Sequence, residues 1–355
     1  MTKSLQDTII IIITILFFIY IIHYLYMVNK SNNTSHFTNT AGGFTVDAVI
    51  TYVDGSDPIW LAEKQKFPKN PDETANSRNI WRWETNGEAK QCIKLIKRNA
   101  PFFRKIFLVM SGPSQIPKWL DEVRKIEPKI PIEVMYHHQF YKSKQDLPTY
   151  NSLSIEANMH RIPGLSEYFV YFNDDCFISN KVSVSDFIDP ANGKLLIQLE
   201  DEASAKRGTP GVAEIGFFSA WKNTHKMLDT LFPLSAKENR KMIRHIPQIQ
   251  RKSTHAKLHE LFPKNFETTS SSKFRNTKCN LSSAGFAEYY ELYTGTGRPY
   301  KNTYVQAFIS NDTNRNKGFL DKFKTKKPQF LNIQNTVTNN ELAKKQLRDF
   351  INLLG

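Results

Sequence analysis

Short runs of apolar, β-branched and aromatic residues recur through the first 200 residues, and each run ends at polar or turn-forming residues. Five such runs predict strands, at 46–53, 106–110, 132–136, 168–172 and 195–199. Two stretches between them, 88–98 and 152–160, place apolar side chains at helical spacing. Because strands alternate with helices, the pattern predicts an α/β fold with a central, largely parallel sheet.

The second half of the chain is predicted to be more helical. Helical patterns cover 213–231, 250–262, 284–293 and 341–354, and the last of these is amphipathic. The stretch 317–327 is basic and is expected to be a solvated loop.

Residues 9–28 form an almost wholly apolar run. Twenty residues in a helix span about 30 Å, the thickness of a hydrocarbon core. We therefore expect a retained transmembrane anchor in residues 1–28, a flexible stem in 29–43 and one folded domain in 44–355. Lys3 and Lys30 flank the run almost equally, so the charge rule leaves the orientation open, and protease protection of the intact chain would decide it.

Composition narrows the class of protein. With 355 residues and 40% apolar content the chain can bury a substantial core, which argues against a disordered protein or a small disulfide scaffold. Its formal net charge of +14 calls for an anionic partner, which could be phosphate, nucleic acid or a membrane surface. The three cysteines, Cys92, Cys176 and Cys279, build no zinc pattern, although one disulfide is compatible with them.

Two acidic clusters directly follow predicted strands. Asp54-Gly55-Ser56-Asp57 follows the first strand, and Asn173-Asp174-Asp175 follows the fourth. Ligands of parallel sheets bind at the carboxyl ends of the strands, and adjacent carboxylates suit a hard divalent cation that also contacts substrate phosphates. Taken alone, the first cluster is better explained as a tight turn. The second fits a capped turn and a metal site equally well.

Four groups of motifs follow one another along the chain. The first region is 47–58 with Trp60. The second comprises 82–88, Ala100-Pro101, 116–120, 147–152, 155–165 and 171–175. The third comprises His245-Ile246-Pro247, Phe262-Pro263, Phe266, Thr268 and Phe274-Arg275, and the last is 308–312. Together they resemble the Stealth family of sugar-1-phosphate transferases, which includes bacterial capsule polysaccharide phosphotransferases and the catalytic subunit of the lysosomal-enzyme N-acetylglucosamine-1-phosphotransferase.

The sequence also departs from the family pattern. Tyr52 stands where many members have Trp, and Thr85 and Ala89 stand where Asp and Leu are common, which leaves the role of Glu88 open. The short gap between Trp60 and Arg82 indicates a compact member without large inserted modules. Recognition of lysosomal proteins is therefore not expected.

The resemblance implies a site and a reaction. Catalysis falls to Glu156, Asp175, His245 and Arg275, with Mg²⁺ or Mn²⁺ held by Asp174 and Asp175. The division of acid and base roles between Glu156 and His245 stays open. The candidates for nucleotide-sugar binding at the strand ends are Asp54, Gly55, Ser56, Asp57, Arg82 and Asn86.

The expected reaction moves a hexose-1-phosphate, such as N-acetylglucosamine-1-phosphate, from a nucleotide sugar to a glycan hydroxyl and releases a nucleoside monophosphate. The nearest alternative is a membrane-anchored, metal-dependent glycosyltransferase that transfers the sugar alone and releases a nucleoside diphosphate. A basic module that binds nucleic acid or anionic glycans is a weaker alternative, because strand-end carboxylates would repel a polyanion.

The expected partners follow from the reaction. They are a nucleotide sugar donor, a glycan or polysaccharide acceptor and a membrane, with no nucleic acid. A homo-oligomer is compatible with the sequence. The resemblance implies the Golgi membrane in a eukaryote and the inner membrane in a bacterium. The sequence does not identify the sugar, the nucleotide or the acceptor.

Overall fold

The computed structural model describes residues 43–203, 216–236, 238–337 and 340–354. The predicted membrane anchor at 1–28 and nearly all of the predicted stem at 29–43 lie outside these residues, as do residues 213–215 of a predicted helix. Among the helices that are described, none has both the length and the apolar character needed to cross a membrane.

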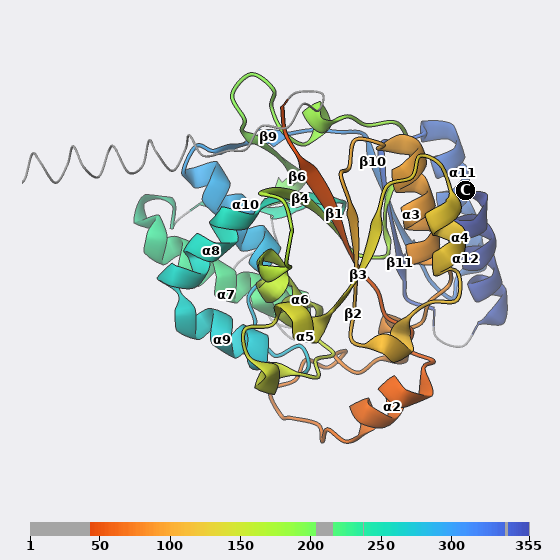
Figure 1. Ribbon diagram of the computed structural model, residues 1–355, viewed down its shortest axis with the longest axis horizontal. Helices are drawn as coiled ribbons and strands as arrows, with labels where there is room; N and C mark the ends of the chain where they lie inside the picture. Colours follow the sequence, from red (N-terminus) through yellow and green to blue (C-terminus); the bar gives the residue numbers. More distant parts are fainter. Residues whose placement is uncertain (1–42, 204–215, 237, 338–339, 355) are drawn as a thin grey trace, which may run out of the picture. The chain divides into compact units, whose positions relative to one another are not determined.

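A five-stranded sheet forms the centre of the fold (Figure 1). Its strands, in spatial order, are β3 (Ile132–Tyr136), β2 (Ile106–Met110), β1 (Val46–Thr51), β4 (Tyr168–Phe172) and β8 (Gln248–Arg251). The first four are parallel, and β8 pairs antiparallel with β4 at the edge. The predicted α/β fold with a largely parallel central sheet is thereby confirmed.

The apolar runs form parallel strands because both faces of the sheet are buried. Alternate residues of β1 point to two different cores. Ala48 and Ile50 pack in the larger one with Ile93 and Ile96, and Val49 packs in the other with Phe169. In Figure 1, α3 (Glu88–Asn99), α4 (Leu120–Lys125), α11 (Thr313–Lys326) and α12 (Glu341–Leu353) lie on one side of the sheet. The other side carries α6 (Ser152–Asn158), α7 (Gly216–Leu231), α8 (Lys252–Leu261), α9 (Pro263–Ser271) and α10 (Ser283–Tyr293).

Two three-stranded sheets complete the described part of the fold. One contains β10 (Tyr304–Ile309), β11 (Phe330–Asn335) and β5 (Cys176–Ile178). The other contains β7 (Lys241–Ile243), β6 (Leu195–Ala203) and β9 (Gly297–Tyr300). The predicted strand at 195–199 therefore exists, as part of β6, but belongs to a separate mixed sheet.

Three sequence-based expectations about local structure need correction or refinement. Residues 317–326 of the stretch 317–327, expected to be a loop, lie in α11, where Asp312 caps the first turn and Phe319 and Phe323 pack against the core. The predicted helix at 250–262 begins as strand β8. The three cysteines are free, and buried Cys92 donates through Sγ to the carbonyl of Cys176 at 3.3 Å. The short helix α2 (Pro58–Gln65) follows β1, and α5 (His137–Phe140) follows β3.

A matched pair of leucines tests this assignment of the core. Leu108 of β2 is fully buried, so Leu108→Ala should lower the free energy of unfolding by about 2–5 kcal/mol because a cavity replaces the side chain. Leu234 is fully exposed, and Leu234→Ala should change the same quantity by less than about 0.5 kcal/mol. Urea unfolding measures both, and equal losses in the two variants would contradict the assignment.

Candidate active site

The parallel pairing of β1 with β4 brings two loops together at the carboxyl edge of the central sheet. Ile50 of β1 lies opposite Phe172 of β4, so the residues after each strand leave the sheet side by side. Tyr52 and Val53 on one loop and Asn173 on the other line a pocket of about 630 Å³. The pocket thus lies where open α/β sheets bind their ligands.

All four residues that the family resemblance singles out as catalytic line this pocket: Glu156, Asp175, His245 and Arg275. They come from four separate segments, namely α6, the end of β4, the link between β7 and β8, and the segment after α9. Asp174, Glu88 and Arg82 line the pocket as well. The fold therefore gathers charged residues that are far apart in the sequence.

Asp175 and His245 form an ion pair at the pocket wall. His245 Nε2 lies 3.3 Å from Asp175 Oδ1, and the two side chains are one-third and about one-fifth exposed. Burial works against both charges, but their mutual attraction outweighs it: the pKa of His245 is raised and the pKa of Asp175 is lowered. The pair therefore favours an imidazolium next to a carboxylate.

Glu156 is almost fully buried on α6. Burial raises its pKa to about 7, against the opposing attraction of Arg275 and His245. The Tyr171 hydroxyl donates to Glu156 Oε1 at 3.4 Å and to Asn173 Oδ1 at 2.7 Å. A carboxyl group with a pKa near neutrality can accept and release a proton at physiological pH.

Two arginines in the pocket form no close ion pair with a described acidic side chain. Arg275 donates through Nη2 to the Ser152 hydroxyl at 2.8 Å, and Arg82 donates through Nε to the carbonyl of Asn76 at 2.6 Å. In the part of the chain that the structure describes, no carboxylate forms an ion pair with either. Burial, with repulsion from Arg275, lowers the pKa of Arg82 to about 9. Arg275 feels the charges of Glu156 and Asp175 without forming a close ion pair with them. Two neighbouring guanidinium groups without a close ion-pair partner favour binding of a multiply charged anion.

Three carboxylates form the opposite electrostatic group. Burial and repulsion by Asp175 raise the pKa of both Asp174 and Glu88. Neither forms an ion pair with any described Lys, Arg or His, and Glu88 accepts from the backbone and side-chain nitrogens of Asn86. Oxygen ligands of this kind suit Mg²⁺ or Mn²⁺.

One of these carboxylates, Asp175, also lies close to two other possible metal ligands. Asp175, Cys176 and His245 offer atoms within 4.8 Å of one another. Burial raises the pKa of the Cys176 thiol, so this sulfur stays protonated and is a poor ligand for a hard cation. The side chains here that suit a hard cation are the neighbouring carboxylates Asp174 and Asp175, and Glu88 does not join them in a described group of ligand atoms within 4.8 Å.

The Asp54-Gly55-Ser56-Asp57 motif is not among the described residues that line the pocket. Asp54 Oδ1 accepts from the Ser56 backbone and hydroxyl, and Asp57 caps α2 and accepts from Ser114 and Gln115. Gly55 N donates to the carbonyl of Trp83 at 2.8 Å, and a Cβ at Gly55 would lie 2.4 Å from that oxygen. The motif thus packs the segment that carries Arg82 against the strand end.

Asn151 is a residue of the site that sequence reasoning quoted but gave no role. Its side chain is fully buried, and its Oδ1 accepts from Leu153 N and caps α6. Its Nδ2 donates to the carbonyls of Ser272 and Phe274 and to Asn280 Oδ1. Asn151 therefore ties the start of the helix that carries Glu156 to the segment that carries Arg275. Its place just before a helical pattern was the available signal, because asparagine favours the N-cap.

Comparison with known proteins follows the same segments. Residues 82–196 match the family model described as Stealth protein CR2, conserved region 2, and residues 244–285 match Stealth protein CR3, conserved region 3. An exopolysaccharide phosphotransferase of Streptomyces coelicolor is 32% identical over 281 residues, which is 78% of this chain and 49% of the relative. A capsular polysaccharide phosphotransferase of Actinobacillus pleuropneumoniae is 36% identical over 176 residues, or 49% of this chain and 45% of the relative.

The chain spans about half the length of these curated relatives. Among solved structures, apo mouse xyloside xylosyltransferase 1 matches with a TM-score of 0.36 and 9% identity, over 81% of this chain and 97% of that chain.

The two matched regions contain all four residues expected to be catalytic. Region 2 includes Arg82, Glu156 and Asp175, and region 3 includes His245 and Arg275. With both conserved regions present in order, the chain belongs to the Stealth family.

Proposed function

We propose that this protein transfers a sugar-1-phosphate from a nucleotide sugar to a hydroxyl of a glycan, forming a phosphodiester and releasing a nucleoside monophosphate. The observation that carries the proposal is the gathering in one pocket of carboxylates and two arginines that form no close ion pair with a described acidic side chain. The relatives named as polysaccharide phosphotransferases support the same class of reaction and a polysaccharide as the acceptor.

Arg82 and Arg275 would bind the diphosphate of the donor. A guanidinium group can donate two parallel hydrogen bonds to phosphate oxygens, which fixes the orientation of the group as well as its charge. Phosphoryl transfer depends mainly on such positioning and on neutralisation of the equatorial oxygens. Binding of the diphosphate would also relieve the repulsion between the two arginines.

Asp174 and Asp175 would hold a divalent cation, and Glu88 would add negative charge nearby. When bound, Mg²⁺ or Mn²⁺ supplies positive charge to the phosphate oxygens. Burial and repulsion from Asp175 raise the pKa of Asp174 and Glu88, and a cation beside these carboxylates would offset that repulsion.

Glu156 would take the proton of the acceptor. The acceptor oxygen attacks the phosphorus next to the sugar, the bond from this phosphorus to the bridging oxygen breaks, and the nucleoside monophosphate leaves with that oxygen. His245 is paired with Asp175 and its pKa is raised, so it suits the role of a cation that stabilises or protonates the leaving phosphate. This assignment gives the two groups different tasks.

The first test is the identity of the released nucleotide. The purified full-length chain, with Mg²⁺ or Mn²⁺, a panel of nucleotide sugars and acceptor glycans, should release nucleoside monophosphate in an acceptor-dependent reaction that chromatography can follow. Release of nucleoside diphosphate would instead assign the chain to the alternative class, in which only the sugar moves.

Paired variants separate the site from the surface. Arg275→Ala and His245→Ala should each lower turnover by about 10²–10³-fold, because each removes a charge that stabilises the transition state. The exposed residues Arg348 and His138 provide the matched controls, and Arg348→Ala and His138→Ala should keep wild-type turnover. Turnover that survives both site substitutions would exclude these residues from catalysis.

Metal binding can be measured without any substrate. Asp174→Asn should weaken Mn²⁺ binding, followed by electron paramagnetic resonance, by at least about tenfold, which is the loss typical of an altered metal site. Asp321→Asn, on the exposed face of α11, should bind Mn²⁺ as the wild type does. Equal binding by both variants would contradict the carboxylate site.

The pKa of Glu156 makes a prediction about stability as a function of pH. The folded-state pKa is about 7 against an ordinary value of 4.5, so folding favours the protonated form. Its contribution is fully favourable below pH 4.5 and is lost as the pH rises to about 7. Arg275, His245, Tyr171 and Glu288 are the charged and titratable groups around it.

Glu156→Gln should therefore be more stable than the wild type at pH 8 by on the order of 2–3 kcal/mol, yet inactive. Urea unfolding from pH 4 to pH 8 measures the difference, which should vanish at the acidic end. A pH-independent difference would show that Glu156 titrates normally, and full activity of the variant would exclude it as the base.

A further inference from the structure

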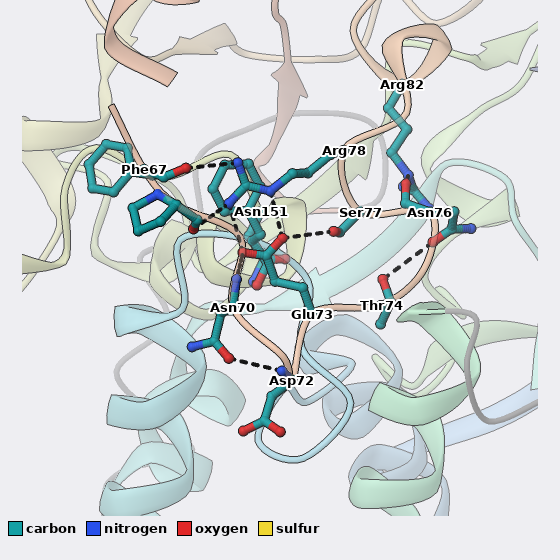
Figure 2. A network of polar contacts seen from close by, with 12 residues as sticks. Phe67, Asn70, Asp72, Glu73, Thr74, Asn76, Ser77, Arg78, Arg82 and Asn151 are labelled. Atoms are coloured by element: carbon teal, nitrogen blue, oxygen red, sulfur yellow. Dashed lines mark hydrogen bonds and ion pairs between the residues drawn. The ribbon is translucent and has the colours of Figure 1, made fainter. Parts of the chain in front are cut away.

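Arg78 makes an unusually complete set of contacts next to the pocket without lining it. Its Nε and Nη2 donate to the two carboxylate oxygens of Glu73 at 2.7 and 2.8 Å. Its Nη1 and Nη2 donate to the carbonyls of Phe67 and Pro68 at 2.9 and 2.8 Å. Figure 2 shows the guanidinium between Phe67 and Glu73, on the same loop as Arg82. Glu73 neutralises the charge of Arg78, so this arginine is not free to bind an anion.

The same guanidinium also contacts the segment that carries Arg275. Its central carbon lies 3.8 Å from the centre of the Phe274 ring. Phe274 stacks on Tyr150, whose ring centre is 5.2 Å away and which lines the pocket. Arg78 is therefore fixed to residues 67–73 on its own loop and to the residue before Arg275.

A short chain of hydrogen bonds connects Arg82 to Arg275 beside this contact. Arg82 Nε donates to the carbonyl of Asn76, and Asn76 Oδ1 accepts from the Thr74 hydroxyl at 3.3 Å. Thr74 N donates to the carbonyl of Arg275 at 3.0 Å. Figure 2 shows Arg82, Asn76, Thr74 and Arg78 along this one loop. The position of one pocket arginine relative to the other thus depends on residues 73–82.

This connection holds two like charges near each other. Arg82 and Arg275 repel each other, and neither has an ion-pair partner among the described residues. Without a rigid connection the two side chains would separate, and an anion would have to bring them together when it binds. The ordering of side chains at that moment weakens binding. A loop locked in advance removes this cost.

We propose that Arg78 is a positioning residue that locks loop 66–83 onto the Phe274–Arg275 segment and so holds Arg82 and Arg275 as a preformed binding site for a diphosphate. The inference rests on the proposed function for its substrate class, because the diphosphate is that of the nucleotide sugar. It assigns Arg78 no contact with substrate. Arg78 acts through Arg82 and Arg275.

A double-mutant cycle on pyrophosphate binding tests the proposal. Calorimetric titration of the full-length chain with inorganic pyrophosphate gives the dissociation constant for the wild type, Arg78→Ala, Arg82→Ala and the double variant. Arg78→Ala should weaken binding by roughly tenfold, and in the Arg82→Ala background the same substitution should cost less than about twofold, because coupled residues are not additive. Arg78→Lys should resemble Arg78→Ala, since an ammonium group cannot serve the carboxylate, two carbonyls and the ring together.

Arg240 provides a matched control for loss of stability. Arg240 is a buried arginine and, like the partly exposed Arg78, it binds a carboxylate, Asp229 at 2.8 Å, and lies over an aromatic ring. It is not among the described residues that line the pocket. Arg240→Ala should lower the melting temperature while leaving the affinity for pyrophosphate at the wild-type value.

Three results would overturn the proposal: wild-type affinity in Arg78→Ala, equal losses from that substitution with and without Arg82, or an equal loss in Arg240→Ala. Failure of the wild type to bind pyrophosphate would overturn it as well. Release of nucleoside diphosphate in the turnover assay would instead refute the proposed function. A coupled loss of pyrophosphate binding would then still support the positioning role, because both reactions use a diphosphate donor.

Discussion

The parallel pairing of β1 with β4 is the constraint on which the pocket depends. It places the ends of two buried apolar strands side by side, so that Tyr52 and Asn173-Asp174-Asp175 leave the sheet at one edge. Helices pack on both faces of this sheet, and the segments that follow α9 and β7 bring Arg275 and His245 to the same edge. The charged groups can meet there because the strands beneath them are fixed by a core on each face.

The pocket contains buried like charges that lie near one another. Such repulsion lowers the stability of the folded protein, so packing alone does not explain why these side chains are gathered. Asp174 and Glu88 have raised pKa values because they are buried near Asp175, and Arg82 has a lowered pKa because it is buried near Arg275. Stable proteins usually neutralise buried charges by pairing them. Here the only ion pair among the described residues named as catalytic is that of Asp175 with His245. A cation at the carboxylates and a diphosphate at the arginines would relieve both repulsions. The proposed ligands therefore carry charges opposite to those of the side chains that would bind them.

The four parallel strands of the central sheet could be predicted from the sequence, because they are continuous apolar runs that end at turn residues. The edge strand β8 (Gln-Ile-Gln-Arg) has no such run, and part of it was expected to be helical. The smaller sheets were harder, since β5, β7 and β9 are only three or four residues long and depend on tertiary pairing. The basic stretch at 317–327 was wrongly expected to be a loop. The prediction rested on its many lysines and overlooked Phe319 and Phe323, which pack against the core. The four residues expected to be catalytic came from the family resemblance. Arg78 and Asn151 escaped functional assignment because their effect lies in contacts with loops about 120 to 200 positions away.

The central claim is that phosphorus travels with the sugar. The most direct measurement is ³¹P nuclear magnetic resonance of the acceptor glycan after reaction with the full-length chain and an active nucleotide sugar. The account predicts a phosphodiester resonance in the purified glycan, absent when Arg275→Ala replaces the wild type. A glycan that gains the sugar but shows no phosphorus signal would contradict it.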